Sequence, residues 1–287
     1  MLERYVDLHA HTVYSDGSVS PADLVTTAAS YGASAVAITD HDTVGGLIEA
    51  RAAADRAGIE FVDGIEISAE YSPGTMHILG YCIDANSPAL KSKIEELQRA
   101  RARRNPEIVA RLQSLGFEMD YDEVLDVAGK EIVGRPHFAR LLLAKGYVAT
   151  MQEAFDKYLA KGAAAYVEKM RLSPGDAIAL IHDAGGVAVL AHPYQLRLSL
   201  FAEEEALIEE LAALGLDGIE AIYSRHSETQ RTAYSEMAKR HGLLVTGGSD
   251  YHGSFKPDID LVKGLGDLRV PYLILEAVKD RAAAFAA

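Results

Sequence analysis

Short apolar runs alternate with helical patterns along most of this 287-residue chain. Several runs are continuously apolar, as parallel strands covered on both faces are. The helical patterns between them often end in glycine, a common helix terminator. Repeated strand–helix units of this kind predict an α/β fold with a TIM-like barrel. The seven predicted strands are residues 5–11, 34–40, 60–68, 75–83, 186–193, 217–223 and 243–250.

One long stretch breaks this alternation. Residues 88 to about 168 carry helical patterns and no clear strand. We therefore expect an inserted helical domain at residues 88–168, a cap or second domain with substrate contacts, and a barrel formed by residues 1–87 and 169–287. The chain is 49% hydrophobic, which suffices for one large core or for a core and a smaller domain.

Composition excludes several classes of protein. The single cysteine, Cys82, rules out an internal disulfide and suits a reducing compartment. No run approaches a membrane span, and the N-terminus lacks a basic segment followed by an apolar one, so we expect a cytoplasmic protein without a membrane partner. A formal net charge of −14 argues against nonspecific nucleic-acid binding. Nothing in the sequence indicates an obligate protein partner.

Histidines and carboxylates gather where the predicted strands end. His9 and His11 close the first strand, and residues two apart on a strand share a face. Asp250 and His252 repeat that spacing at the last strand. The ends of parallel barrel strands lie on one face, where such enzymes place their active sites. The residues concerned are His9, His11, Asp16, Asp40, His41, Glu66, His77, His192, Asp250 and His252.

Such a set of side chains suits a multinuclear metal site. Six histidines with three or four carboxylates and no thiolate fit Mn²⁺, Fe²⁺ or Zn²⁺, and they are too many for one ion. Glu66, on a central strand, is the candidate to bridge two ions. Three divalent ions with Asp16, Glu66 and Asp250 leave a pocket of about +3, which favours an anion. Attack of a metal-activated water on a phosphate ester is the natural chemistry of such a pocket.

Two further residues lie in the predicted insertion. The stretch "GRPHFAR" contains Arg135 and His137. The guanidinium group is well shaped for phosphate. Taken by itself, the insertion favours the other interpretation, in which Arg135 faces solvent at a helix N-terminus.

The successive motifs "DLHAHTVYSDG", "ITDHDT", "GIEIS", "HILGY", "AHP" and "GGSDYH" resemble those of the polymerase and histidinol phosphatase (PHP) family. The resemblance implies a distorted seven-stranded (β/α) barrel that holds two or three divalent ions, expected to be Mn²⁺ with Fe²⁺ or Zn²⁺ as alternatives. It implies a role for Asp40 behind the ligands or near the reacting water, and catalytic roles for Asp40, His192 and Arg135. The implied ligands are His9, His11, Glu66 and Asp250 for one ion, Glu66, His77 and His192 for a second, and Asp16, His41 and His252 for a third.

The stretches "GRPHFARLL" and "YSRHSETQ" are similar to one branch of that family. Members of this branch remove the 3′-phosphate from nucleoside 3′,5′-bisphosphates and act as 5′-to-3′ exoribonucleases on short RNA. The similarity implies a small phosphorylated nucleotide or a short 5′-phosphorylated RNA as the substrate. It also implies that Arg135, His137 and His226 hold substrate phosphate.

Three other functions remain open from the sequence. A histidinol-phosphate phosphatase has the same chemistry, although the insertion favours a nucleotide-sized substrate. An amidohydrolase often bridges its metals with a strand-end lysine, whereas this chain has Glu66 there. A non-catalytic nucleotide- or RNA-binding module would be supported by the arginine-rich residues 98–111, but every expected ligand position is filled.

Overall fold

The computed structural model describes residues 4–129 and 133–285. The chain divides into two compact units. The barrel unit comprises Met1–Ser92 and Arg171–Ala287, and the helical unit comprises Lys93–Met170. Residues 130–132 of the expected insertion lie outside the described residues.

The strands of the barrel unit form one sheet in the order β7-β6-β5-β4-β3-β2-β1-β8. Neighbouring strands are parallel except that β4 runs antiparallel to β3 and β5, and β8 runs antiparallel to β1. The antiparallel β4 explains why the fourth predicted strand directly follows the third. The strands are β1 (Tyr5–Asp7), β2 (Ala33–Ile38), β3 (Glu60–Ala69), β4 (Met76–Tyr81), β5 (Val187–Leu190), β6 (Gly218–Tyr223), β7 (Leu244–Gly248) and β8 (Val270–Pro271).

The first and seventh strands approach each other and nearly close the barrel. The backbone N–H of Leu8 donates to the carbonyl of Gly247 at 3.3 Å, and that of Asp250 donates to the carbonyl of His9 at 2.8 Å. The predicted α/β fold with a TIM-like barrel is confirmed. All seven predicted strands are present, and the short β8 joins the sheet beside β1.

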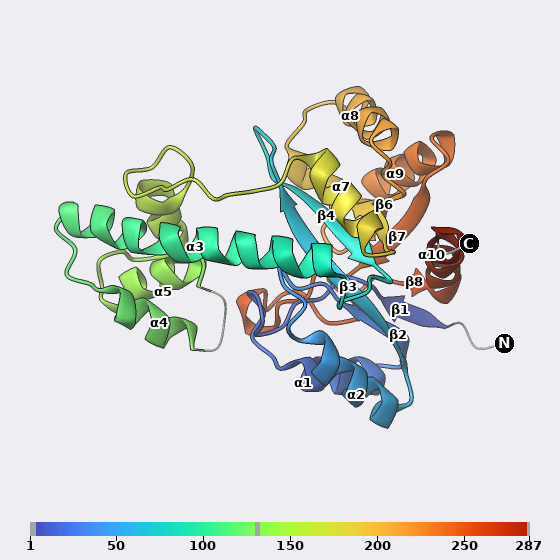
Figure 1. Ribbon diagram of the computed structural model, residues 1–287, viewed down its shortest axis with the longest axis horizontal. Coiled ribbons are helices and arrows are strands. Elements are labelled where there is room, and N and C mark those ends of the chain that lie inside the picture. Colours follow the sequence, from blue (N-terminus) through green and yellow to red (C-terminus); the bar gives the residue numbers. More distant parts are fainter. Residues whose placement is uncertain (1–3, 130–132, 286–287) are drawn as a thin grey trace. The chain divides into compact units, whose positions relative to one another are not determined.

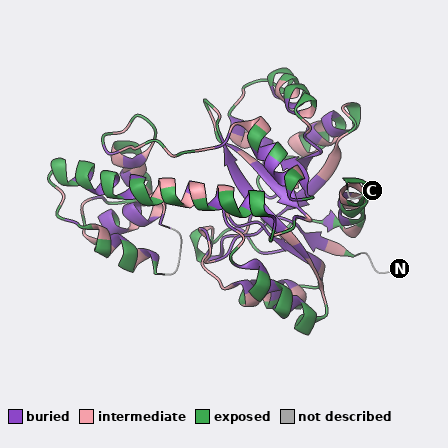
Figure 2. Ribbon diagram, in the orientation of Figure 1, coloured by how far each residue is buried: buried purple, intermediate pink, exposed green. Residues whose placement is uncertain are grey.

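Helices lie outside the strands of the barrel unit, and the strands are buried (Figures 1 and 2). The hydroxyls of Ser20, Ser173 and Ser227 accept a hydrogen bond from the first turn of α1, α7 and α9 respectively, which satisfies a backbone N–H that has no partner within the helix. The helices are α1 (Pro21–Ser30), α2 (Leu47–Ala57), α7 (Pro174–Asp183), α8 (Phe201–Ala213), α9 (Glu228–Arg240) and α10 (Tyr272–Phe285).

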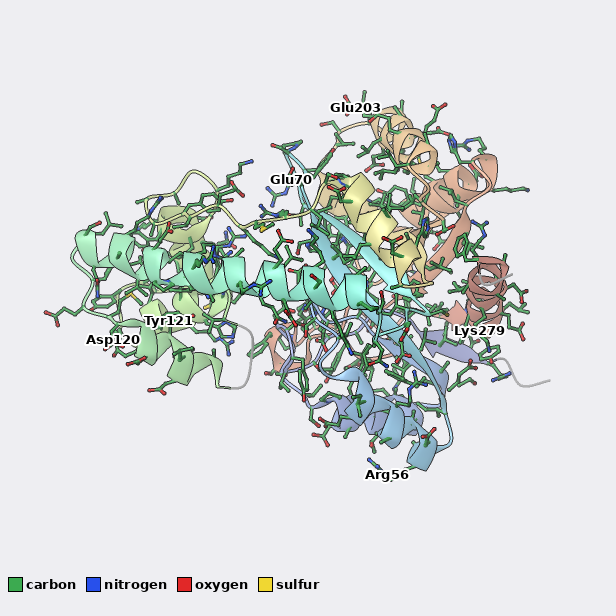
Figure 3. All side chains as sticks on the ribbon, in the orientation of Figure 1. Arg56, Glu70, Asp120, Tyr121, Glu203 and Lys279 are labelled. Atoms are coloured by element: carbon green, nitrogen blue, oxygen red, sulfur yellow. The ribbon has the colours of Figure 1, made fainter. Side chains whose placement is uncertain are left out.

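The strand β8 and the helix α10 were not predicted from the sequence. Leu275 and Val278 of α10 are fully buried in the same apolar cluster as Val6 and Val187. Lys279, labelled in Figure 3, pairs with Glu60 at 2.7 Å on the outer side. A two-residue strand is too short to produce an alternating pattern, so the last helix had no preceding strand to reveal it.

The helical unit has an apolar core of its own. Ile108, Leu112, Phe138 and Leu142 are fully buried there. A capping box at Asp120 begins α4 (Asp120 and Tyr121 are labelled in Figure 3). Its helices are most of α3 (Pro88–Ser114), α4 (Tyr121–Ala128), α5 (Arg135–Ala144) and α6 (Met151–Ala154), which continues as a π-helical turn at Phe155–Leu159.

The arginine-rich part of α3 serves partly in packing. The buried Arg104 donates to the side-chain oxygen of Asn105 at 2.9 Å. Arg111 donates to the carbonyl of Tyr166. Arg99 is exposed and lies 3.8 Å from Glu95 on the same helix face. Among the described residues, no helix has the length and apolarity needed to cross a bilayer.

We predict that Asp7→Ala destabilises the barrel. Asp7 is fully buried, and its carboxylate accepts hydrogen bonds from the backbone N–H groups of Ser249 and Val262, both at 2.8 Å, and of His9 at 3.2 Å. Leaving these donors unpaired should cost on the order of 2–4 kcal/mol in total, at about 1–3 kcal/mol for a buried orphaned group. Urea denaturation of the metal-free protein measures this loss. Asp55→Ala, on the exposed face of α2, is the control. Equal unfolding midpoints for both variants would contradict the role of Asp7.

Candidate metal centre

The nine predicted metal ligands converge at one end of the barrel. His9 and His11 follow β1, and Asp16 lies in the loop after them. Glu66 and His77 are on β3 and β4. The others follow β2, β5 and β7. Among the described residues, donor atoms within 4.8 Å of one another form four overlapping groups: His11, Asp16, His41 and His252; His9, Glu66 and His192; His9, His11 and Asp250; and His41, Glu66 and His77.

One group forms between the ends of β1 and β7. The Nε2 atoms of His9 and His11 are 3.1 Å apart. Oδ1 of Asp250 lies 3.4 Å from Nε2 of His11 and 3.6 Å from Nε2 of His9. Two ligands that each bind a metal at about 2.1 Å, with an angle of about 90–120° between them, lie roughly 3.0–3.6 Å apart. The spacing of these three side chains therefore fits a shared ion.

Glu66 lies at the middle of the cluster. Its Oε1 is 2.8 Å from Nδ1 of His77 and 3.0 Å from Nε2 of His192. Its Oε2 is 3.1 Å from Nδ1 of His41 and 3.2 Å from Nε2 of His11. The two oxygens thus face different histidines, the arrangement that a bridging carboxylate requires.

The surroundings of two buried donor atoms show whether metal ions fit here. Oε2 of Glu66 and Nδ1 of His41 are enclosed by protein, yet neither has a hydrogen-bond partner of acceptable geometry among the described residues. Buried polar atoms are otherwise almost always hydrogen-bonded. Oxygen and imidazole donors that converge without hydrogen-bond geometry suit divalent ions such as Mn²⁺, Fe²⁺ or Zn²⁺.

The remaining group surrounds Asp16. Its Oδ1 is 3.3 Å from Nε2 of His252, and its Oδ2 is 3.7 Å from Nε2 of His41. His41 therefore presents one ring nitrogen to Asp16 and the other to Glu66. Since His11 and His41 each belong to two of the groups, the division of the nine donors among two or three ions stays a prediction.

The candidate ligands differ in their protonation states. Burial acts to raise the pKa of Glu66, but the surrounding histidines, His41 and His77 foremost, outweigh it and hold that pKa well below its ordinary value. Burial lowers the pKa of His41 to about 3. At neutral pH that carboxylate is ionised and that imidazole is neutral, as metal ligands need to be. Burial acts to lower the pKa of His11, but its hydrogen bonds to Asp250 and Glu66 outweigh burial and raise that pKa to about 9, so a metal ion would have to displace a proton from His11.

Sequence reasoning missed Glu220, a buried carboxylate on β6 that supports two candidate ligands. Its Oε1 is 2.8 Å from Nδ1 of His9, and its Oε2 accepts the backbone N–H of His192 at 2.8 Å. A proton on Nδ1 of His9 leaves Nε2 free to bind a cation. The sequence signal for Glu220 is its position as a charged residue inside the apolar run "DGIEAIY".

The backbone is strained where two of the strands end. The non-glycine residues His192 and Asp250 have φ values of 26° and 58°. Such conformations cost about 1–3 kcal/mol each and persist where the surroundings hold them. Here the Glu220 carboxylate holds the N–H of His192, and the carbonyl of His9 holds that of Asp250. These backbone conformations direct both side chains into the cluster.

Tyr223 and Lys256 were also missed. Both reach Oδ2 of Asp250, the tyrosine hydroxyl at 2.7 Å and the lysine Nζ at 2.6 Å. The other oxygen of Asp250 faces the histidines. Lys256 lies in an irregular loop, where no periodic pattern could have identified it.

The predicted catalytic Asp40 is buried behind the cluster. Its carboxylate accepts hydrogen bonds from the N–H and hydroxyl of Thr12, at 2.8 and 2.6 Å, and from the hydroxyl of Ser15 at 2.6 Å. These contacts order the loop that leads to Asp16. The geometry favours a positioning role for Asp40 over contact with a reacting water.

The predicted phosphate contacts lie in both units. Arg135 begins α5 in the helical unit and donates to the carbonyl of Leu159 at 3.1 Å. His137, two residues on, is buried, and its Nδ1 accepts the N–H of Gly134 at 2.9 Å, which caps the helix.

His226 belongs to the barrel unit. Its Nδ1 bonds the carbonyl of Ala221 at 3.0 Å, and its ring packs against Tyr223. Burial lowers the pKa of His226 to about 3, so the ring is neutral. A buried neutral ring does not present a cation to phosphate, and the geometry gives the predicted contact no support.

We predict that Glu220→Gln weakens metal binding by about 10- to 100-fold, the usual effect of losing a carboxylate that orients a metal-bound histidine. Titration of the metal-free protein with Mn²⁺, followed by the signal of free Mn²⁺, measures the affinity without relying on activity. Glu228→Gln, at the exposed start of α9, is the matched control. Equal Mn²⁺ affinities in Glu220→Gln and the wild type would exclude the supporting role.

Comparison with known proteins identifies the family. The PHP domain model matches residues 7–171. A 3′,5′-nucleoside bisphosphate phosphatase of Chromobacterium violaceum is 38% identical over 250 residues, covering 86% of this chain and 87% of that protein. A 5′-3′ exoribonuclease of Haemophilus influenzae is 36% identical over 253 residues, covering 88% and 91% respectively.

A solved structure shares both the fold and the sequence similarity. It is a protein of Bifidobacterium adolescentis that was assigned as a metal-dependent phosphoesterase. It is 34% identical, has a TM-score of 0.84, and covers 97% of this chain and 96% of its own. With the barrel and its strand-end histidines, these matches establish that the chain belongs to the PHP domain family.

Proposed function

We propose that this protein removes the 3′-phosphate from nucleoside 3′,5′-bisphosphates and also degrades short 5′-phosphorylated RNA. As a member of its family it is a metal-dependent hydrolase of phosphoric esters. The observation that carries the proposal is the convergence of six histidines and three carboxylates at the strand ends. The choice of substrate is supported by relatives of those two activities that match nearly the whole chain.

Lewis-acid activation of water and neutralisation of phosphoryl oxygens are the chemistry that bound divalent ions supply in such a site. We propose Mn²⁺ as the ion, held by the nine converging residues. The chain's own contribution is to keep the donors in place. Glu220 orients His9, and Asp40 orders the loop of Asp16. Glu66 faces histidines with both oxygens, so we propose that it bridges two ions.

The substrate phosphate needs cationic donors in addition to metal ions. Arg135 and His137 are the proposed contacts in the helical unit, on the strength of the family resemblance. In the barrel unit His192, whose Nε2 lies 3.0 Å from Oε1 of Glu66, is proposed both as a ligand and as a catalytic residue. Arg135 would supply a planar fork of N–H donors that matches phosphoryl oxygens.

A turnover panel tests the substrate. We expect the Mn²⁺-loaded protein to release phosphate from adenosine 3′,5′-bisphosphate with a kcat/KM at least roughly tenfold above that for histidinol phosphate, a difference of about 1.4 kcal/mol in transition-state stabilisation. Chelation of the metal should abolish the activity, and added Mn²⁺ should restore it. A preference for histidinol phosphate, or full activity in the chelator, would refute the proposal.

We predict that Arg135→Ala lowers kcat/KM for the bisphosphate while the bound metal is unchanged, because no candidate metal ligand lies among the described residues of the helical unit. Loss of a charge-assisted phosphate contact should cost on the order of 1.5–3 kcal/mol, or roughly ten- to more than a hundredfold. Arg135→Lys should not fully restore the rate, since a point charge cannot replace the fork.

Metal analysis and initial rates together check this prediction. Arg99→Ala removes an exposed arginine from the neighbouring α3 and serves as the control. A wild-type rate in Arg135→Ala would make the arginine an ordinary structural residue. Loss of metal in the same variant would contradict the separation of the two roles.

A further inference from the structure

A cleft of about 470 Å³ lies beside the metal centre within the barrel unit. We call it the cationic cleft, because its walls include Arg197, Arg225 and Lys256 together with Tyr194 and Tyr223. None of the described residues that line it is a carboxylate. In a chain with a net charge of −14, such a concentration of positive side chains creates a local attraction for anions.

The three cations differ in their partners. Lys256 pairs with Asp250. Arg225 pairs with the exposed Asp258 at 2.8 Å, an interaction that solvent screens. Arg197 is exposed, and within the described part of the chain no acidic group lies at ion-pair distance from its guanidinium. Arg197 therefore offers its N–H donors to a ligand.

The segment that carries Arg197 packs against the turn between β3 and β4. The N–H of Thr75, in the turn between β3 and β4, donates to the carbonyl of Gln195 at 2.9 Å. A Cβ on Gly74 would come within 2.2 Å of that carbonyl oxygen, so the turn fits closely only with glycine. His226 packs behind the two tyrosines that line the cleft, with ring centroids 5.0 Å from Tyr223 and 5.6 Å from Tyr194.

Asp250 connects the cleft to the metal centre. One carboxylate oxygen faces His9 and His11, while the other takes Lys256 and Tyr223 from the cleft wall. The wall of the cleft therefore contacts one of the candidate metal ligands directly. A bisphosphate has a second phosphoryl group that needs a site of its own while the first one reacts.

We propose that the cationic cleft binds the phosphoryl group of the substrate that is not hydrolysed, and that Arg197 is its principal contact. The inference rests on the proposed function and adds the determinant of specificity. It explains how the site selects a bisphosphate over a monophosphate. In RNA, the neighbouring phosphate of the backbone would occupy the same place.

The test compares two substrates in the Mn²⁺-loaded protein, adenosine 3′,5′-bisphosphate and adenosine 3′-monophosphate. Arg197→Gln should raise KM for the bisphosphate about tenfold or more with kcat within about twofold, because a charge-assisted contact to an unreacting group is lost. It should leave kcat/KM for the monophosphate unchanged. Arg197→Lys should recover part of the loss. Arg56→Ala, an exposed arginine on α2 (Figure 3), is the control and should alter neither substrate.

Equal losses on the two substrates, or no loss on either, would overturn the proposal. If the wild type hydrolyses neither nucleotide, the proposed function fails and the cleft is tested by binding alone. Calorimetry with adenosine 5′-monophosphate and the metal-free protein then decides. Binding that is about tenfold weaker in Arg197→Gln than in the wild type supports the cleft as an anion site. Equal binding, or none to either protein, refutes it.

Discussion

The carboxylate of Glu66 is buried among histidines that come from the ends of four barrel strands. An unpaired charge in such a place would cost several kcal/mol. Here four imidazoles from the ends of β1, β2, β4 and β5 lie within 3.2 Å of its two oxygens. The same contacts hold its pKa low and leave one oxygen without a hydrogen bond, ready for a cation. Stability and metal binding therefore depend on one group of atoms.

A layer of buried carboxylates behind the cluster sets its geometry. Asp7 accepts a hydrogen bond from the backbone N–H of Ser249, just after β7, and Asp40 accepts one from Ser15 in the loop that contains Asp16. Glu220 binds the ring of His9 and the strained backbone N–H of His192. Each accepts two or more hydrogen bonds, which compensates for its burial. Rigid support of this kind keeps donors within the tolerance that a metal site demands.

The sequence revealed those parts of the molecule that follow a local pattern. The seven barrel strands are apolar runs, and the nine candidate ligands sit where those runs end, so both could be predicted. Lys256 and Tyr223 could not be predicted, because their role is to bond Asp250, and only the folded chain places them next to it. His226 was predicted to contact phosphate, yet only the structure reveals its burial behind Tyr223. The α10 helix was missed because its partner strand has two residues.

The central claim is that the strand-end histidines and carboxylates hold divalent ions. Anomalous diffraction from a crystal soaked in Mn²⁺ tests it directly, since the signal locates the ions without reference to activity. We expect at least two anomalous peaks within the cluster, with Glu66 between two of them. Peaks elsewhere with none among these nine side chains would contradict it.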